Sequence, residues 1–195
     1  MAALLSFDCE FSHPAPGLGA LMQIGMVVVP WDPETLSVVP NDAPGLKLKL
    51  NFPVAARDTV TDWVKKNQSA LLAECKAMSP DDYYTSRDKV VAFLKKAADM
   101  YGDPITPCGW CLGSDMAYLL HLLGEDNELV HYSAVDLKAM VIPMMGALDP
   151  GDKETAAFLG VTPIAPDKEH DALEDAMYQL KLVLAAFKRV RETSR

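Results

Sequence analysis

Leu4-Leu5-Ser6-Phe7-Asp8-Cys9-Glu10-Phe11 is the stretch that decides the fold, because an apolar run ends there in two acidic residues. Turn-forming residues follow soon after it, so residues 4–7 predict a short strand. Side chains two positions apart on a strand point to the same face, which places the Asp8 and Glu10 carboxylates side by side. Two like charges at the edge of a core cost free energy unless a partner such as a divalent cation compensates them. The alternative is a strand end that frays into solvent, where acidic residues are ordinary.

The residues that follow this strand predict an antiparallel meander. Residues 12–19 are rich in proline and glycine and predict a loop. The apolar run at 23–29 and the alternating run at 46–50 each predict a further strand. The N-terminal part of the chain therefore predicts three consecutive antiparallel strands.

After the third strand, segments with apolar residues at helical spacing alternate with short apolar runs. Thr85 or Ser86 is a candidate cap for one helix, and Gly102 and Gly124 are candidate stops. The predicted helices are 58–77, 85–102, 114–123, 136–145 and 172–191, and the predicted later strands are 105–110 and 129–135. Strands that give way to alternating strand and helix indicate an α/β fold, with a mixed five-stranded sheet and helices packed on its faces.

The length of 195 residues indicates one domain, 1–195, and a hydrophobic content of 50% is enough for a sizeable core. The net charge of −9 argues against non-specific wrapping of duplex nucleic acid, because phosphate affinity needs clustered lysine and arginine. It is compatible with an enzyme that holds the last nucleotides of a strand, where bound divalent cations supply the positive charge.

The sequence gives no sign of a membrane or of export. No stretch approaches the roughly 18 consecutive apolar residues of a membrane span, and the N-terminus lacks the basic region of a signal peptide. The four cysteines, Cys9, Cys75, Cys108 and Cys111, are therefore expected to be reduced thiols in a cytoplasm.

A second acidic signal lies in Gly109-Trp110-Cys111-Leu112-Gly113-Ser114-Asp115, where a predicted strand gives way to a helix. Asp115 can face the same site as the first two acids from this position. Taken alone, it is equally well explained as a first-turn acid that the helix dipole stabilises.

The third signal is Glu169-His170-Asp171-Ala172-Leu173-Glu174-Asp175-Ala176. Five residues within one helix turn by about 500°, so His170 and Asp175 reach one site only if His170 lies on the loop before the helix. Pro163 and Pro166 do place His170 on a loop. Imidazole titrates near neutral pH, which suits a general base, although a lone loop histidine is usually only solvated.

These three signals, in this order, resemble the motifs of the DEDDh exonucleases, the DnaQ-like branch of the ribonuclease H-like fold. Asp8-Cys9-Glu10 matches the Asp-x-Glu that ends the first strand in that family. Gln23-Ile24-Gly25 matches the apolar strand that follows, which begins near Ile-Gly. The resemblance spans nearly the whole chain, and each motif by itself is short.

The other two motifs match in part. Residues 109–115 share the first Gly and the last Asp of Gly-His-Asn-x-x-Phe-Asp, whereas Cys111 stands at the Asn position and Ser114 at the Phe position. Residues 170–175 match the His-x-x-x-x-Asp that opens the last helix, with Ala172 and Ala176 in place. The departure weakens the assignment of Asp115 but leaves its chemical type unchanged.

The resemblance implies a metal-dependent 3′→5′ exonuclease that hydrolyses phosphodiester bonds from the 3′ end of single-stranded DNA or RNA. It implies two Mg²⁺ or Mn²⁺ ions and His170 as the general base. The implied metal ligands are Asp8, Glu10, Asp115 and Asp175. Many relatives are homodimers, so a second copy of the chain is an expected partner.

Three residues are candidates for contacting the substrate: Phe11, Ser12 and Trp63. Aromatic rings such as those of Phe11 and Trp63 stack on any base, and Ser12 is predicted to line the same cleft. The alternative for Trp63 is a core position on its helix. Thr59-Val60 followed by Trp63 is also similar to a stretch found in a subgroup of phage and bacterial members, including exoribonuclease-like ones.

Two readings from other classes remain as alternatives. Cys108 and Cys111 form a Cys-x-x-Cys, which occurs in thiol redox proteins when the first cysteine is exposed at a helix N-terminus. Here the pair falls within or at the end of a predicted strand, and a zinc site would need a second cysteine pair. An inactive relative that only binds nucleic acid is the other alternative, although all five catalytic residue types are present.

Overall fold

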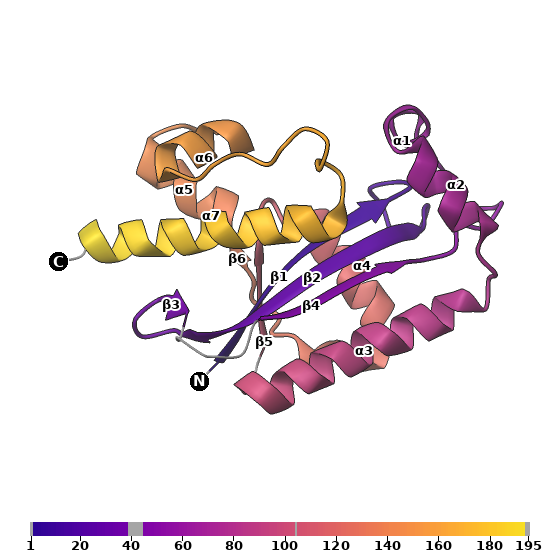
Figure 1. The fold of residues 1–195 in the computed structure, drawn as a ribbon, viewed down its shortest axis with the longest axis horizontal. Coiled ribbons are helices and arrows are strands. Elements are labelled where there is room, and N and C mark those ends of the chain that lie inside the picture. The colour runs from indigo at the N-terminus through magenta and orange to yellow at the C-terminus, as the bar shows by residue number, and fades with distance from the viewer. Residues whose placement is uncertain (1, 39–44, 104, 194–195) are drawn as a thin grey trace.

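A mixed sheet of six strands forms the centre of the computed structural model, which describes residues 2–38, 45–103 and 105–193 (Figure 1). The strands are β1 (Ala2–Phe11), β2 (Leu21–Asp32), β3 (Ser37–Val38), β4 (Leu46–Asn51), β5 (Ile105–Gly109) and β6 (Val135–Asp136). Their order is β3-β2-β1-β5-β6, and β4 also pairs with β2. One edge of β2 pairs with β1. The other edge of β2 pairs with β4 and, further along, with β3, so the sheet is five strands wide.

The strand directions confirm the predicted α/β fold. β2 runs antiparallel to β1 and β4, whereas β5 runs parallel to β1 and β6 runs parallel to β5. In the β1–β2 register, Asp8 lies opposite Gly25 and Glu10 lies opposite Gln23. Asp8 and Glu10 therefore lie beside Gln23-Ile24-Gly25, the second stretch on which the family resemblance rests.

The two faces of β1 are covered by different helices. Leu5, Phe7 and Cys9 belong to a core formed with α3 (Asp82–Tyr101) and α4 (Gly113–Leu123). The even-numbered positions face α7 (Ala172–Thr193), because the Ser6 hydroxyl donates to the Ala176 carbonyl, 2.8 Å away. Asp8 and Glu10 therefore lie on the α7 side of the sheet.

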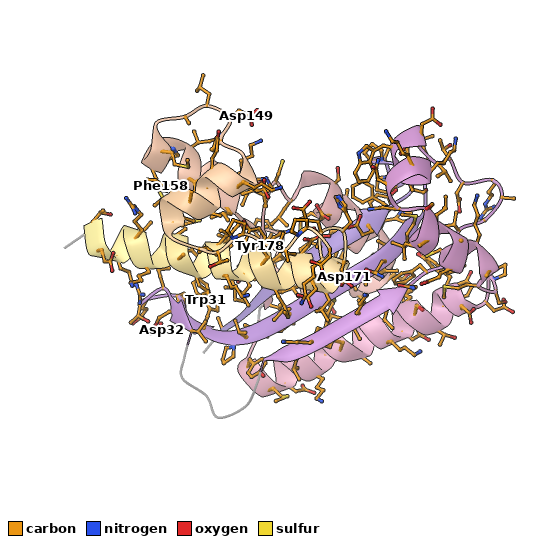
Figure 2. The ribbon with its side chains drawn as sticks, turned by 45° about the horizontal axis from the view of Figure 1, so that its top comes forward. Trp31, Asp32, Asp149, Phe158, Asp171 and Tyr178 are labelled. Carbon is orange, nitrogen blue, oxygen red and sulfur yellow. The ribbon has the colours of Figure 1, made fainter. Side chains whose placement is uncertain are left out.

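The N-terminal end of helix α7 packs in close contact with the sheet at Gly25. A Cβ on Gly25 would lie 2.1 Å from the Ala172 carbonyl carbon, so only glycine allows this approach. Figure 2 shows Asp171 at the start of α7, with Trp31 and Tyr178 further along this layer. Helices α5 (Leu137–Met145) and α6 (Asp152–Leu159) pack on the side of α7 that faces away from β4 (Figure 1).

The predicted helix over 58–77 is wrong in its extent, because the chain forms two short helices there. These are α1 (Asp62–Asn67) and α2 (Ser69–Ala77), separated by Gln68, whose backbone leaves the helical conformation at φ −126° and ψ 32°. Val64, Leu72 and Cys75 anchor both helices on a small core of their own beside Met22. The apolar spacing that predicted one helix thus continues across the break.

Two other sequence predictions need correction. Helix α3 begins at Asp82 rather than at Thr85 or Ser86, because Ser86 is buried inside it and its hydroxyl donates to the Asn51 carbonyl. The predicted strand over 129–135 is mostly absent: residues Gly124–Leu129 form a 3₁₀ helix, Val130 makes an isolated bridge to Ile105, and β6 has two residues. Strand β3 and helix α6 were not predicted.

None of the helices in the described ranges combines the length and the apolar character that a bilayer crossing requires.

Candidate active site

The first-strand acids each receive a hydrogen bond from a glutamine. The Gln179 side-chain amide on α7 donates to Asp8 Oδ1 over 2.8 Å. The Gln68 amide, from the break between α1 and α2, donates to Glu10 Oε2. Both glutamines leave the second oxygen of their carboxylate available to a cation.

Asp115 reaches the same strand from the first turn of α4. Its Oδ1 accepts the Cys9 backbone N–H over 2.9 Å. The β1–β5 ladder ends at Ser6 and Cys108, so the N–H of Cys9 has no strand partner on that side and is satisfied by the carboxylate. Asp115 is thereby placed at the end of β1 beside Asp8 and Glu10.

His170 lies on the turn before α7, and Asp175 lies in the first turn of the helix, as their spacing predicts. His170 has a left-handed backbone, with φ +67°, and its N–H donates to Asp175 Oδ2 over 2.9 Å. Its ring Nδ1 is 3.9 Å from Glu10 Oε1. One ligand atom each from Glu10, His170 and Asp175 lies within 4.8 Å of the others.

Burial raises the pKa of all four acids, and neighbouring negative charges add to this effect for Asp8, Glu10 and Asp175. Burial raises the pKa of Asp8 well above its usual range, and the charges of Asp115, Glu10 and Asp175 raise it further. Burial likewise raises the pKa of Glu10 to about 7, against the hydrogen bond from Gln68. Burial raises the pKa values of Asp115 and Asp175 to about 6. A group of acids in this state binds positive charge strongly.

The donor set fits hard divalent cations. In each of the four carboxylates, one oxygen accepts a hydrogen bond from a protein N–H, and the other oxygen is the one that a cation can use. Carboxylate oxygens are the ligands that Mg²⁺ and Mn²⁺ prefer. The nearby cation Lys49 is already engaged by Asp171, at the start of α7. Two divalent ions would therefore match the charge of this site.

Known structures share this fold with the chain at low sequence identity. No protein-family model and no curated protein sequence matches it. S. pombe Pop2p in its Mg²⁺- and Mn²⁺-bound form superposes with a TM-score of 0.61 and 15% identity, over 97% of this chain and 84% of that one. A full-length 3′-exonuclease superposes with a TM-score of 0.60 and 10% identity, over 98% of this chain and 82% of that one. The chain has a ribonuclease H-like fold.

Trp63, one of the predicted substrate contacts, lies beside His170. It lies on α1, and its ring meets the His170 ring edge-on, with the centroids 5.2 Å apart. The alternative of a core position is wrong, because 51% of Trp63 is exposed. A flat, exposed ring at the rim of a carboxylate cluster is suited to stacking on a base.

The structure does not bring the Phe11 ring or the Ser12 hydroxyl to the carboxylates. Phe11 lies on the opposite face of β1 from Glu10 and stacks on Tyr118, with centroids 4.9 Å apart. Ser12 is fully buried, and its hydroxyl donates to the Thr59 carbonyl and accepts the Ala20 N–H. The substrate contacts predicted for these two side chains are therefore not supported, because both are engaged in fixing the loop after β1.

Two residues of the candidate site, Gln68 and Gln179, were missed by the sequence reasoning. Gln179 follows Asp175 by four residues on the same helix face, which is a usable signal. Its Oε1 also accepts the Trp110 N–H over 2.8 Å, and a Cβ on Gly109 would lie 2.4 Å from that oxygen. Gln179 thus ties Asp8 to the end of β5. Gln68 gives no comparable signal, because an isolated glutamine between two helical stretches looks like a surface residue.

The cysteines do not form a redox or zinc site in the described part of the chain. All four are free thiols. Cys108 is buried in β5, and burial raises its pKa, which is the opposite of what an attacking thiol requires. Cys9 is buried on the face of β1 away from Asp8 and Glu10, as predicted.

Proposed function

We propose that the chain is a metal-dependent 3′→5′ exonuclease that hydrolyses phosphodiester bonds at the 3′ end of single-stranded DNA or RNA. One observation carries this proposal: four carboxylates from β1, α4 and α7 meet with raised pKa values, and in the hydrogen bonds of the described residues each uses one of its two oxygens. The likeness to a 3′-exonuclease and to metal-bound Pop2p supports the choice within the many activities that this fold hosts.

Asp8, Glu10, Asp115 and Asp175 would hold two Mg²⁺ or Mn²⁺ ions. Bound divalent ions supply the positive charge that activates a water molecule and stabilises the leaving 3′ oxygen. The hydrogen bonds from Gln179, Gln68, Cys9 and His170 orient the carboxylates before any ion arrives. This preorganisation lowers the cost of assembling the site.

His170 is the proposed general base. Its backbone is fixed by Asp175, whereas its side chain is 48% exposed and can meet a water molecule. Its Nδ1 lies 3.9 Å from Glu10 Oε1, so the ring is close enough to the carboxylates to take the proton of a water molecule held there. Trp63, edge-on to this ring, offers its face to the terminal base, a contact worth about 1–3 kcal/mol.

The test is digestion of single-stranded DNA and RNA labelled at the 5′ or the 3′ end, with Mg²⁺, with Mn²⁺ or with EDTA. We expect 5′-labelled strands to shorten stepwise and 3′-labelled strands to release a labelled mononucleotide first, with both reactions abolished by EDTA. Cleavage that persists with the chelator would overturn the proposal. Metal-dependent binding of the strand without any cleavage would indicate an inactive binding module instead.

Replacing His170 by alanine is expected to lower kcat about a hundredfold and to leave substrate binding nearly unchanged, because general base catalysis contributes about 10²–10⁴. Single-turnover digestion separates the two quantities. The matched control is His131→Ala, which removes an imidazole ring that bonds to the Ser133 backbone and stacks on the neighbouring Tyr132 ring. Equal rates in the two variants would remove His170 from the mechanism.

Replacing Gln179 by leucine is expected to raise the Mg²⁺ concentration needed for half-maximal activity about tenfold. The variant keeps the side-chain volume but loses the bonds to Asp8 and to the Trp110 backbone, and such outer hydrogen bonds contribute about 10–100-fold to metal affinity. Gly109→Ala should reproduce the effect, because its Cβ would displace the Gln179 amide. An unchanged metal dependence in a folded Gln179→Leu protein would contradict this role.

A further inference from the structure

A cavity of about 610 Å³ lies on the opposite side of the β1 end from the carboxylates. Its walls come from the loop after β1, the segment between β4 and α1, the start of α3 and the middle of α4. The volume falls in the range of small-ligand sites, roughly 300–1,000 Å³. Neither the proposed catalysis nor the terminal-base contact at Trp63 uses it.

Helix α4 connects the cavity to the carboxylates. Asp115 lies in the first turn of α4, and Tyr118 and His121, both in the cavity wall, follow on the next turns. At 1.5 Å per residue, His121 is only about 9 Å along the helix axis from Asp115. Tyr118 also stacks on Phe11, the residue after Glu10, and its hydroxyl donates to the His13 carbonyl over 2.5 Å. The cavity and the carboxylates are therefore connected through α4 and through the end of β1.

The lining is suited to a flat heterocycle more than to a phosphate. Tyr83 and Tyr84 present two rings at 89° to one another with centroids 5.6 Å apart, and 68% of Tyr84 is exposed. Arg57 forms no ion pair with any described residue, whereas Asp58 and Asp81 in the same wall are acidic. Mixed charge of this kind gives no net attraction for phosphate, but it supplies donors and acceptors to the edge of a base.

We propose that this cavity receives a nucleobase on the 5′ side of the scissile bond, so that the enzyme prefers strands of several nucleotides over dinucleotides. The inference rests on the proposed exonuclease function and names the substrate class of that site. Tyr84 stacks on the base, and Arg57 contacts its edge or a neighbouring sugar. The phosphates on either side remain in solvent, away from Asp58 and Asp81.

The experiment compares wild type, Tyr84→Ala and Arg57→Ala, with Tyr132→Ala as the matched control for loss of an exposed tyrosine outside the cavity. The substrates are single strands from dinucleotides to octanucleotides with one common 3′ end, together with the p-nitrophenyl ester of thymidine 5′-monophosphate. We expect wild-type kcat/KM to rise with length and then level off. Tyr84→Ala is expected to lose about tenfold on the longer strands, with the ester and the dinucleotide changed by less than about twofold.

The outcomes separate this inference from the exonuclease proposal. A loss confined to longer strands supports the cavity as a base site, whereas equal losses on all substrates, or no loss relative to Tyr132→Ala, overturn it. If wild type cleaves neither the ester nor any strand, the exonuclease proposal fails. Fluorescence anisotropy of a labelled octanucleotide with Ca²⁺ then decides: weaker binding by Tyr84→Ala than by Tyr132→Ala supports the base site, and equal binding overturns it.

Discussion

Replacing Asp8 by asparagine is expected to lower kcat/KM by about 10³–10⁴, the largest loss of any single substitution at this site. Asparagine keeps the shape and the hydrogen bond from Gln179, but it removes the charge that the divalent ions need. Loss of about 4–6 kcal/mol of transition-state stabilisation corresponds to a loss of this size. The measurement is single-turnover digestion of a labelled strand at saturating Mg²⁺.

The same substitution is expected to stabilise the metal-free protein. Asp8 is half-buried beside three other carboxylates, and its pKa is raised by desolvation and further by their charges. Removing that charge relieves the repulsion, and we expect the free energy of unfolding near pH 8 to rise by about 1–3 kcal/mol. For a chain of this length, this raises Tm on the order of 5 °C. Thermal unfolding in EDTA measures the change.

Opposite signs for activity and stability distinguish a metal ligand from a structural residue. The control is Asp99→Asn, which neutralises an exposed acid on α3 and should change neither quantity. An Asp8→Asn protein that retains more than about a tenth of wild-type activity would contradict the assignment. So would an Asp8→Asn protein that is less stable than wild type without metal, because Asp8 would then act as a structural anchor.

The acids of the candidate site were predictable because their signals are local. An apolar run that ends in Asp8 and Glu10 fixes which face those carboxylates share, and the prolines before His170 fix it on a loop. The alternation of side chains along β1 determines which helices each residue contacts, because even positions meet α7 and odd positions meet α3 and α4. The antiparallel pairing of β1, β2 and β4 was predicted from the same periodicities.

The parts that were not predicted depend on contacts between distant segments. Gln68 leaves the helical conformation where its side chain turns to Glu10, 58 residues earlier, and no spacing of apolar residues records that contact. Gln179 bonds to Asp8 across 171 residues. Of the predicted strand over 129–135, only Val130 and Val135 pair with β5, the first through an isolated bridge and the second in β6, and the spacing of apolar residues does not record this.

Divalent cations are expected to stabilise the protein much more near pH 8 than near pH 5. The pKa of Glu10 is raised to about 7, and those of Asp115 and Asp175 to about 6, chiefly by burial. The folded protein therefore keeps protons on these groups at pH values where the unfolded chain has released them. Stability contributed by these protons is present below about pH 4 and is lost as the pH rises through 6 and 7.

Bound metal ions are expected to restore the folding stability that is lost as the pH rises, because they compensate the carboxylate charges that appear when the protons leave. A difference of one in pKa corresponds to about 1.4 kcal/mol, so Glu10 alone contributes about 3 kcal/mol. The stability contributed by other acids depends on pH in the opposite direction. The Arg87 hydrogen bond lowers the pKa of Asp126, so the stability from that pair is lost as the pH falls. The quantity to measure is therefore the rise in Tm on adding Mg²⁺ at each pH, in which the contribution of Asp126 cancels.

We expect this rise in Tm to be small near pH 5 and on the order of 10 °C near pH 8, where Glu10, Asp115 and Asp175 have lost their protons. The double variant Asp8→Asn with Glu10→Gln is the control, because it removes two ligands and should show little metal stabilisation at either pH. An equal rise in Tm at both pH values would mean that the cation binds elsewhere on this acidic surface. The raised pKa values of the four carboxylates would then have a structural origin, and the two-ion site would lose its physical basis.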